Sequence, residues 1–168
     1  MTVRTAIPVT EYLDTAFEHP PDYLEGELVE RSMPGTSRSR IQRRVVAATV
    51  VGGEPAGLYV YPEIHLPMAT ERWRIADLAF YAGEAESPYP KRVALGIAEI
   101  LSPRDEVREV LDRLNDCHAW GVPYIWLIDP ERRTIHRYDG ASLLAVDAIE
   151  FAEPAFRLTA EDLFKGSA

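Results

Sequence analysis

Two acidic residues stand in the middle of apolar, strand-like runs of this sequence. Asp77 lies in WRIADLAFY (73–81), and Glu99 lies in VALGIAEIL (93–101). Because side chains alternate between the two faces of a strand, each acid shares its face with apolar neighbours. A buried, unpaired carboxylate is strongly destabilising unless it finds a partner or takes up a proton. Both acids are therefore expected to have a cationic partner.

The partner of these carboxylates is either a metal ion or an arginine. If the two strands are adjacent and both acids face the same side, the carboxylates converge and favour a bound divalent cation. A site with oxygen ligands alone suits Mg²⁺ or Mn²⁺ better than zinc. In the alternative, each acid lies near a sheet edge and pairs with an arginine.

The strands that carry the acids belong to a predicted alternation of helices and strands. Helices are predicted over 9–19, about 37–50, 105–121 and 158–164, and strands over 58–67, 73–81, 93–101, 124–129, 134–138 and 142–151. Residues 23–31 are predicted to form a strand or a tight hairpin with Gly26 near its turn. Thr159 is the expected N-cap of the last helix, with Asp162 at the reciprocal position. This order predicts an α/β fold with a central mixed β-sheet flanked by helices. It is not a Rossmann fold, since no glycine fingerprint follows a strand.

Length and composition predict one soluble domain, residues 1–168, without a structural metal. No apolar run reaches the roughly 18 residues that a membrane span needs. The first nineteen residues also lack the apolar region of a secretory signal. These two observations predict a cytoplasmic location. The single Cys117 excludes an internal disulfide, and no Cys or His cluster indicates zinc.

The charge distribution contains one basic segment in an acidic chain. The net charge of −9 argues against broad affinity for nucleic acid, which requires a local excess of Lys and Arg. RSMPGTSRSRIQRR (31–44) supplies such an excess, since it holds five arginines and no acid. Its candidate nucleic-acid-binding residues are Arg38, Arg40, Arg43 and Arg44. The alternative is an ordinary solvated helix face.

Four segments, in chain order, carry a family resemblance. YLEGELVERSMPG, IADLAFY, AEILSP and RLNDCHAWGVPYIWLIDPERRTIHRY resemble the Uma-type family of restriction endonucleases, which is similar to the PD-(D/E)XK nuclease superfamily. The resemblance covers about residues 8–163, and AWGVPYIWLIDPERRTIHRY is its most specific part. It implies a restriction-endonuclease-like core and hydrolysis of phosphodiester bonds in DNA with Mg²⁺ or Mn²⁺.

The resemblance also implies roles for individual residues. Asp77 and Glu99 take the positions of the metal-binding aspartate and glutamate of such nucleases. The backbone carbonyl of Ile100 is a further expected metal ligand, and Glu27 takes the place of an assisting acid from the N-terminal segment. Arg38 stands where the family often has histidine, and it is expected to contact phosphate.

The chain departs from the family at the catalytic lysine. Its two lysines, Lys91 and Lys165, lie far along the chain from the acids, and Leu101 occupies the usual position after the glutamate. The aligned residue is Arg113, which can hold a phosphate through two hydrogen bonds but cannot exchange a proton near neutral pH. In the alternative, Arg113 forms an exposed helical ion pair with Glu109.

Two functions follow from this departure. The first is a metal-dependent endodeoxyribonuclease with Asp77, Glu99, Glu27 and Arg113 in its catalytic site. The second is a nuclease-fold protein that has lost cleavage and acts as a nucleic-acid-binding or regulatory homodimer. A homodimer suits either function, since cleavage of both strands of a duplex usually needs two sites.

Overall fold

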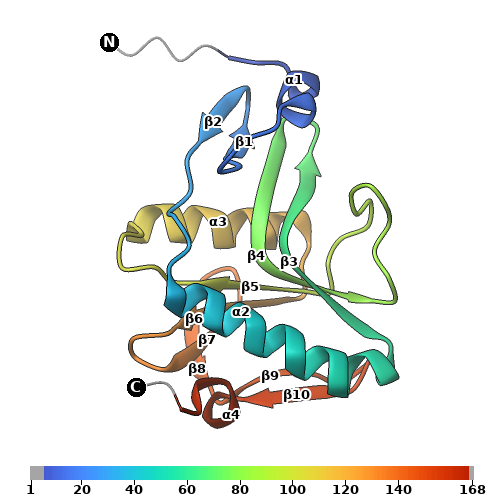
Figure 1. Cartoon of the computed structure of the whole chain (residues 1–168), viewed down its shortest axis with the longest axis vertical. Coiled ribbons are helices and arrows are strands. Elements are labelled where there is room, and N and C mark those ends of the chain that lie inside the picture. The colour runs from blue at the N-terminus through green and yellow to red at the C-terminus, as the bar shows by residue number, and fades with distance from the viewer. Residues whose placement is uncertain (1–5, 167–168) are drawn as a thin grey trace.

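The structure is a computed structural model that describes residues 6–166, and its centre is an eight-stranded mixed sheet flanked by helices (Figure 1). The helices are α1 (Val9–Asp14), α2 (Thr36–Ala48), α3 (Val107–Trp120) and α4 (Ala160–Phe164), with a π-helical turn (Thr49–Gly53) and a 3₁₀ turn (Glu54–Ala56) after α2. The strands are β1 (Asp22–Leu24), β2 (Glu27–Val29), β3 (Leu58–Ala69), β4 (Arg72–Ala82), β5 (Gly96–Ile100), β6 (Tyr124–Asp129), β7 (Thr134–Tyr138), β8 (Leu143–Val146), β9 (Ala148–Phe151) and β10 (Phe156–Thr159).

The main sheet has the order β2-β1-β4-β5-β6-β7-β8, and β3 also pairs with β4. Strands β5 and β6 are parallel, whereas the other neighbouring pairs are antiparallel. A parallel pair needs a crossover connection, which α3 provides between β5 and β6. This arrangement confirms the predicted mixed sheet with flanking helices.

Helices α2 and α3 cover opposite faces of the sheet (Figure 1). Helix α2 buries Ile41 and Val45, four residues apart, against an apolar core that includes Phe80 and Trp126. Helix α3 buries Leu114 and Cys117, three residues apart, against a second core. Members of this second core on the strands are Ala79, Tyr81, Ile97, Ile125 and Leu127. The 3.6-residue period of each helix therefore sets which strand face it covers.

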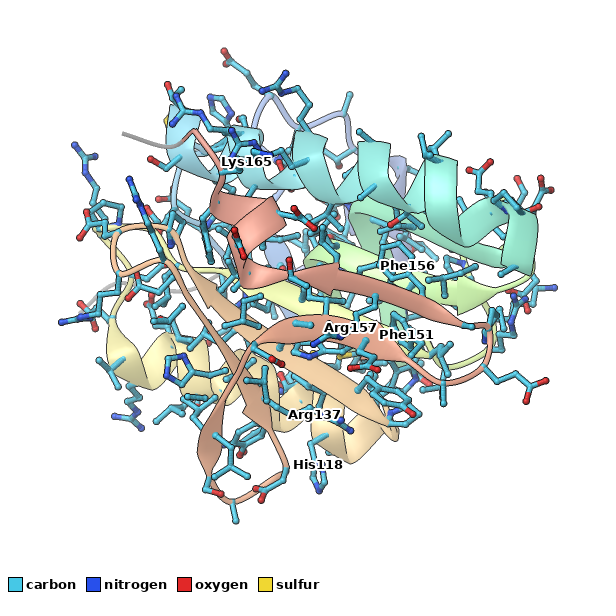
Figure 2. All side chains as sticks on the ribbon, turned by 90° about the horizontal axis from the view of Figure 1, so that it is seen from below. His118, Arg137, Phe151, Phe156, Arg157 and Lys165 are labelled. Atoms are coloured by element: carbon cyan, nitrogen blue, oxygen red, sulfur yellow. The ribbon has the colours of Figure 1, made fainter. Side chains whose placement is uncertain are left out.

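The predicted single strand over 142–151 is wrong, because the chain changes sheets at Asp147. Strand β8 stays on the edge of the main sheet, whereas β9 pairs with β10 in a separate two-stranded sheet. Figure 2 shows Phe151 and Phe156 on these two strands, below α2. Both rings are buried in the core under α2. Burial of the β9 side chains in this core explains why the chain leaves the edge.

Other local predictions vary in accuracy. Strands β6 and β7 have the predicted bounds, and the backbone N–H of Asp162 donates to the Thr159 hydroxyl at 3.1 Å, as expected for the cap of α4. Helix α1 ends at Asp14, five residues before the predicted end. Within residues 6–166, no helix combines the length and the hydropathy that a membrane span requires.

Candidate active site

Asp77 and Glu99 lie side by side where strands β4 and β5 separate. The antiparallel register pairs Leu78 with Ala98, and its continuation sets Asp77 opposite Glu99. Directly opposed residues of an antiparallel pair project from the same face of the sheet. Both acids are buried, with 1% and 6% of their surface exposed. The alternation of apolar residues in the sequence therefore located two acids that the fold brings together.

The Asp77 carboxylate is held by backbone and by arginine. Its Oδ2 accepts a hydrogen bond from the Ile100 N–H at 2.8 Å, and its Oδ1 accepts one from Arg31 Nη2 at 2.9 Å. Arg38 Nη1 lies 3.6 Å from the same Oδ1. In a strand, the N–H and C=O of one residue point toward the same neighbour. The Ile100 carbonyl, the expected further ligand, therefore also faces β4 and Asp77.

The Glu99 carboxylate is paired with Arg113 from α3. Glu99 Oε2 accepts a hydrogen bond from Arg113 Nη2 at 2.5 Å, and the same Nη2 lies 3.1 Å from the Ile75 carbonyl oxygen. Arg113 thus points into the site. The alternative expectation of an exposed pair between Arg113 and Glu109 is wrong, because the guanidinium of Arg113 pairs with the buried carboxylate of Glu99.

Asp22 on β1 is an acid of this site that the sequence interpretation missed. Its Oδ1 accepts from the Ile75 N–H at 2.8 Å, and its Oδ2 accepts from Arg74 Nη1 at 2.9 Å. Arg74 Nη2 in turn contacts Asp116 of α3 at 2.7 Å. The available signal was an acid beside Tyr23 in a short apolar strand, the same kind of signal that identified Asp77.

Glu27, the acid expected to assist, lies elsewhere. It is on β2, opposite Leu24 of β1, so β1 stands between it and β4. Asp22, on the inner strand of this hairpin, is the N-terminal acid that reaches the site. The physical reason is the tight turn at Glu25 and Gly26, which places the GEL triplet on the outer strand.

Glu63 approaches the site from β3 through a distorted backbone. The pairs Pro62 with Leu78 and Ile64 with Ala76 flank it, so it stands across from Asp77. Its φ of 49° is left-handed, a conformation that costs about 1–3 kcal/mol in a non-glycine residue. The carboxylate accepts hydrogen bonds from Arg31 Nη1 at 2.8 Å and from Gln42 Nε2 at 2.7 Å. Such strain is typical of functional sites.

The electrostatics of the pair favour a neighbouring cation. Burial raises the pKa of the Asp77 carboxyl, against the opposing charges of Arg113, Arg38 and Arg31. Burial also raises the pKa of Glu99, the charge of Asp77 raises it further, and Arg113 opposes both effects. Two adjacent carboxylates in this environment gain free energy from any cation that reaches them.

The geometry fits an oxygen-coordinated divalent ion in one respect and resists it in another. The carboxylates of Asp77 and Glu99 and the Ile100 carbonyl are oxygen donors of the kind that Mg²⁺ and Mn²⁺ prefer, and Mg²⁺ usually keeps several waters besides. However, Arg31 and Arg113 already occupy oxygens of both acids. In residues 6–166, no three His, Cys, Asp or Glu side chains are grouped to hold a metal. These residues therefore fit the ion once an arginine releases a carboxylate.

A small cavity gives access to this site. It encloses about 100 Å³, and its lining includes Glu99, Ile100 and Arg113 together with Arg31 and Arg38. We call it the catalytic cavity. Its volume suits a phosphate group or a few waters.

The four candidate arginines of α2 separate into two groups. Arg38 is 4% exposed and turns inward with Ile41 and Val45 at helical spacing. The other three do not face the site: Arg43 is exposed, and Arg40 and Arg44 are half-buried. Of these, Arg44 donates to the Leu163 carbonyl of α4 at 2.8 Å. The fold thus brings Arg38 into the site and leaves the rest outside it.

The site thus lies on a mixed sheet with an α3 crossover, at two opposed acids where strands β4 and β5 diverge. The chain belongs to the Uma2 family, described as "Putative restriction endonuclease", whose family model matches residues 10–164. This confirms the family resemblance in the sequence.

Solved structures support the fold assignment. The crystal structure of a "putative nuclease belonging to DUF820" from Anabaena variabilis superposes with a TM-score of 0.77, at 22% identity over 94% of this chain and 97% of that chain. A cryo-EM structure of a DrdV–DNA complex matches with a TM-score of 0.34, at 15% identity over 65% of this chain and 12% of that chain, too weakly to carry an argument. The comparison with curated proteins found no match.

Proposed function

We propose that this protein is an endonuclease that hydrolyses phosphodiester bonds in DNA with bound Mg²⁺ or Mn²⁺. The observation that carries the proposal is the opposition of two buried carboxylates, Asp77 and Glu99, on adjacent strands that separate at this point. Membership of a restriction endonuclease family supports it. The proposal includes a cytoplasmic homodimer, since two sites are needed to cut both strands.

The residues of this chain have distinct tasks in the proposed reaction. Asp77, Glu99 and the Ile100 carbonyl would hold the metal, which when bound neutralises phosphate charge and lowers the pKa of a coordinated water. Arg38 would donate hydrogen bonds to a phosphate oxygen at the cavity wall. Arg113, released from Glu99, would remain near enough to stabilise negative charge that develops on the phosphate. It would not exchange protons, because its pKa is far too high.

The outer face of α2 would bind the DNA backbone near the site. The helix carries four arginines and no acid, in a chain with a net charge of −9. Arg43 is exposed, Arg40 is half-buried and Arg44 is half-buried beside α4, whereas Arg38 reaches the catalytic cavity from the same helix. A phosphate backbone that follows this helix would therefore lead to the two acids.

A second candidate function is supported by the contact between Arg113 and Glu99. At 2.5 Å, with the arginine 16% exposed, this pair places a permanent cation against an acid that the metal needs. A nuclease-fold protein with such a pair would bind nucleic acid without cutting it. Cleavage assays separate the two functions.

The test is to incubate supercoiled plasmid and single-stranded DNA with the purified protein and Mg²⁺ or Mn²⁺. We expect metal-dependent nicking that falls by at least about 100-fold in Asp77→Asn and in Glu99→Gln, since loss of even an outer-shell partner of a metal ligand typically costs about 10–100-fold. Glu131→Gln, an exposed acid in the turn after β6, is the matched control and is expected to cut like the wild type.

The outcomes are separable. Nicking that survives Asp77→Asn would reject the proposed site. Arg113→Lys supplies the missing lysine and is expected to cut faster than the wild type, because an amine can exchange a proton. If neither protein nicks DNA but both retard it on a gel, the binding function replaces the catalytic one.

A further inference from the structure

A second cavity adjoins the catalytic cavity along a shared wall. It encloses about 480 Å³, against about 100 Å³ for the catalytic cavity. The wall consists of Glu30, Arg31, Ser32 and Arg38, which line both spaces. Pockets for small organic ligands usually have volumes of about 300–1,000 Å³. The larger space, which we call the side pocket, therefore has the size of a ligand site.

The side pocket combines apolar surfaces with a few polar groups. Its apolar lining residues are Pro20, Met33, Pro34 and Ile75. His65 also lines it, and burial and the charge of Arg31 lower the pKa of this imidazole, so its ring is neutral at pH 7. Unstacked nucleobases pack on neutral rings and on apolar side chains of this kind.

Gln42 gives the side pocket a fixed hydrogen-bond acceptor. Its Nε2 donates to Glu63 Oε1 at 2.7 Å and to the Asp77 carbonyl at 3.1 Å. These two contacts use both N–H groups of the amide and set its orientation. The Oε1 atom of Gln42 is thereby left to accept a hydrogen bond from the edge of a bound ligand.

The shared wall holds two donors that lack a partner. Arg31 Nε and Arg38 Nε are buried, and neither has a hydrogen-bond partner among residues 6–166, although Arg31 Nε lies 4.0 Å from Asp22 Oδ1. The two side chains are 9% and 4% exposed. An unsatisfied buried N–H is unfavourable, and a phosphate oxygen is the acceptor that matches a guanidinium best. The wall between the cavities is therefore built to receive a phosphate.

We propose that the side pocket receives one unstacked nucleobase of the DNA strand, while the adjoining phosphate lies against Arg31 and Arg38 at the catalytic cavity. This inference rests on the proposed nuclease function and adds a base-binding subsite to it. Extrusion of a base from a duplex costs a few kcal/mol. Single-stranded DNA is therefore expected to fill the side pocket more readily than duplex DNA of the same sequence.

The test uses 2-aminopurine, whose emission rises when it leaves the base stack. Single-stranded and duplex oligonucleotides with the probe at successive positions are mixed with the full-length protein and Ca²⁺, so that the strand stays intact. Ser39→Trp fills the side pocket, because Ser39 lines it and does not line the catalytic cavity. Ser37→Trp is the matched control, since this exposed residue of the same helix lines neither space.

We expect emission to rise severalfold at one position with the wild type and Ser37→Trp, and to stay at the level of free DNA with Ser39→Trp. Binding of an end-labelled strand, followed by anisotropy, should weaken about fivefold or more in Ser39→Trp, which loses the stacking of one base, and should change less than about threefold in Ser37→Trp. Met33→Ala removes an apolar wall without adding bulk and should weaken capture of the base about fivefold.

Unchanged emission at every position of a strand that binds would overturn the inference and leave the proposed function intact. An emission rise that persists in both Ser39→Trp and Met33→Ala would also overturn it. If the protein binds neither form of DNA, the inference and the proposed function both fail. A rise with single strands alone identifies an already unpaired base as the ligand, whereas a rise with both forms shows extrusion from the duplex.

Discussion

The core under α2 is buried and the charged cluster beside it is largely buried, with Glu63 at its exposed rim, but different interactions hold the two together. In the core, Phe80, Trp126 and Phe151 pack with ring centroids 5.1–6.0 Å apart. In the cluster, nine charged side chains meet around the strand divergence. They are Asp22, Arg31, Arg38, Glu63, Arg74, Asp77, Glu99, Arg113 and Asp116.

The difference between apolar packing and buried ion pairs indicates which part of the molecule stabilises the fold. Apolar burial contributes roughly 25 cal/mol per Å² removed from water. Buried ion pairs often only break even, because desolvation of each charge offsets the attraction between them. We infer that the apolar core supplies most of the folding free energy and that the charged cluster is retained for its function.

The largest expected effect is in the apolar core. Trp126→Ala should lower the free energy of unfolding by about 3–5 kcal/mol, because it removes a large buried ring and leaves a cavity. Urea unfolding followed by circular dichroism measures the change. Val51→Ala, at an 80% exposed side chain, is the control and should change stability by less than about 0.5 kcal/mol. A loss below about 1 kcal/mol in Trp126→Ala would contradict the inference that the apolar core supplies most of the folding free energy.

The next effect concerns the ion pair of the charged cluster. Arg113→Leu should lower the free energy of unfolding by about 3 kcal/mol, since Glu99 is left buried without its partner. The double variant Glu99→Leu/Arg113→Leu should be at least as stable as the wild type, because both desolvation costs disappear. Urea titrations of the three proteins test this. A double variant less stable than the wild type would show that the pair is a net contributor to folding.

The smallest effect is at Glu63, on the rim of the cluster. Burial acts to raise its pKa, but the charge of Arg31 and hydrogen bonds from Arg31 and Gln42 lower it below the ordinary value. A lowered folded-state pKa gives stability that is present above the unfolded pKa and is lost as pH falls through the folded one. Glu63→Gln should therefore cost less than about 1 kcal/mol at pH 7, and the difference from the wild type should diminish from pH 7 to pH 3 as the carboxylate takes up its proton. Urea midpoints at both pH values measure it, and a difference that grows on acidification would contradict the assignment.

Local patterns in the sequence predicted much of the scaffold and half of the site. Alternation put Asp77 and Glu99 on buried strand positions, and the Thr159 cap and strands β6 and β7 were found from their own residues. Both expectations for the acids hold in part: they converge on adjacent strands, and each pairs with an arginine. These features depend on neighbours within a few residues, which a sequence displays directly.

The remainder depends on contacts between distant segments. Arg38 turns inward because Asp77, 39 residues later in the chain, lies beneath α2. Nothing in the sequence of the helix distinguishes Arg38 from Arg40. Asp22 enters the site because β1 pairs with β4, a register that no local pattern specifies. The switch of sheets at Asp147 is set by the aromatic core that β9 joins. Long-range pairing of this kind is what periodicity cannot predict.

The arginines that neutralise Asp77 and Glu99 affect how the protein folds in the absence of any ligand. A zinc finger is unfolded until its metal arrives, because metal binding supplies its free energy of folding. Here Arg31 and Arg113 neutralise the two acids without a metal. The polypeptide is therefore expected to fold, and to stay folded, in a solution that contains a chelator and no free divalent ion. In the proposed nuclease, metal loading would be an exchange of one cation for another, and an incoming phosphate would promote it by attracting the displaced guanidinium groups.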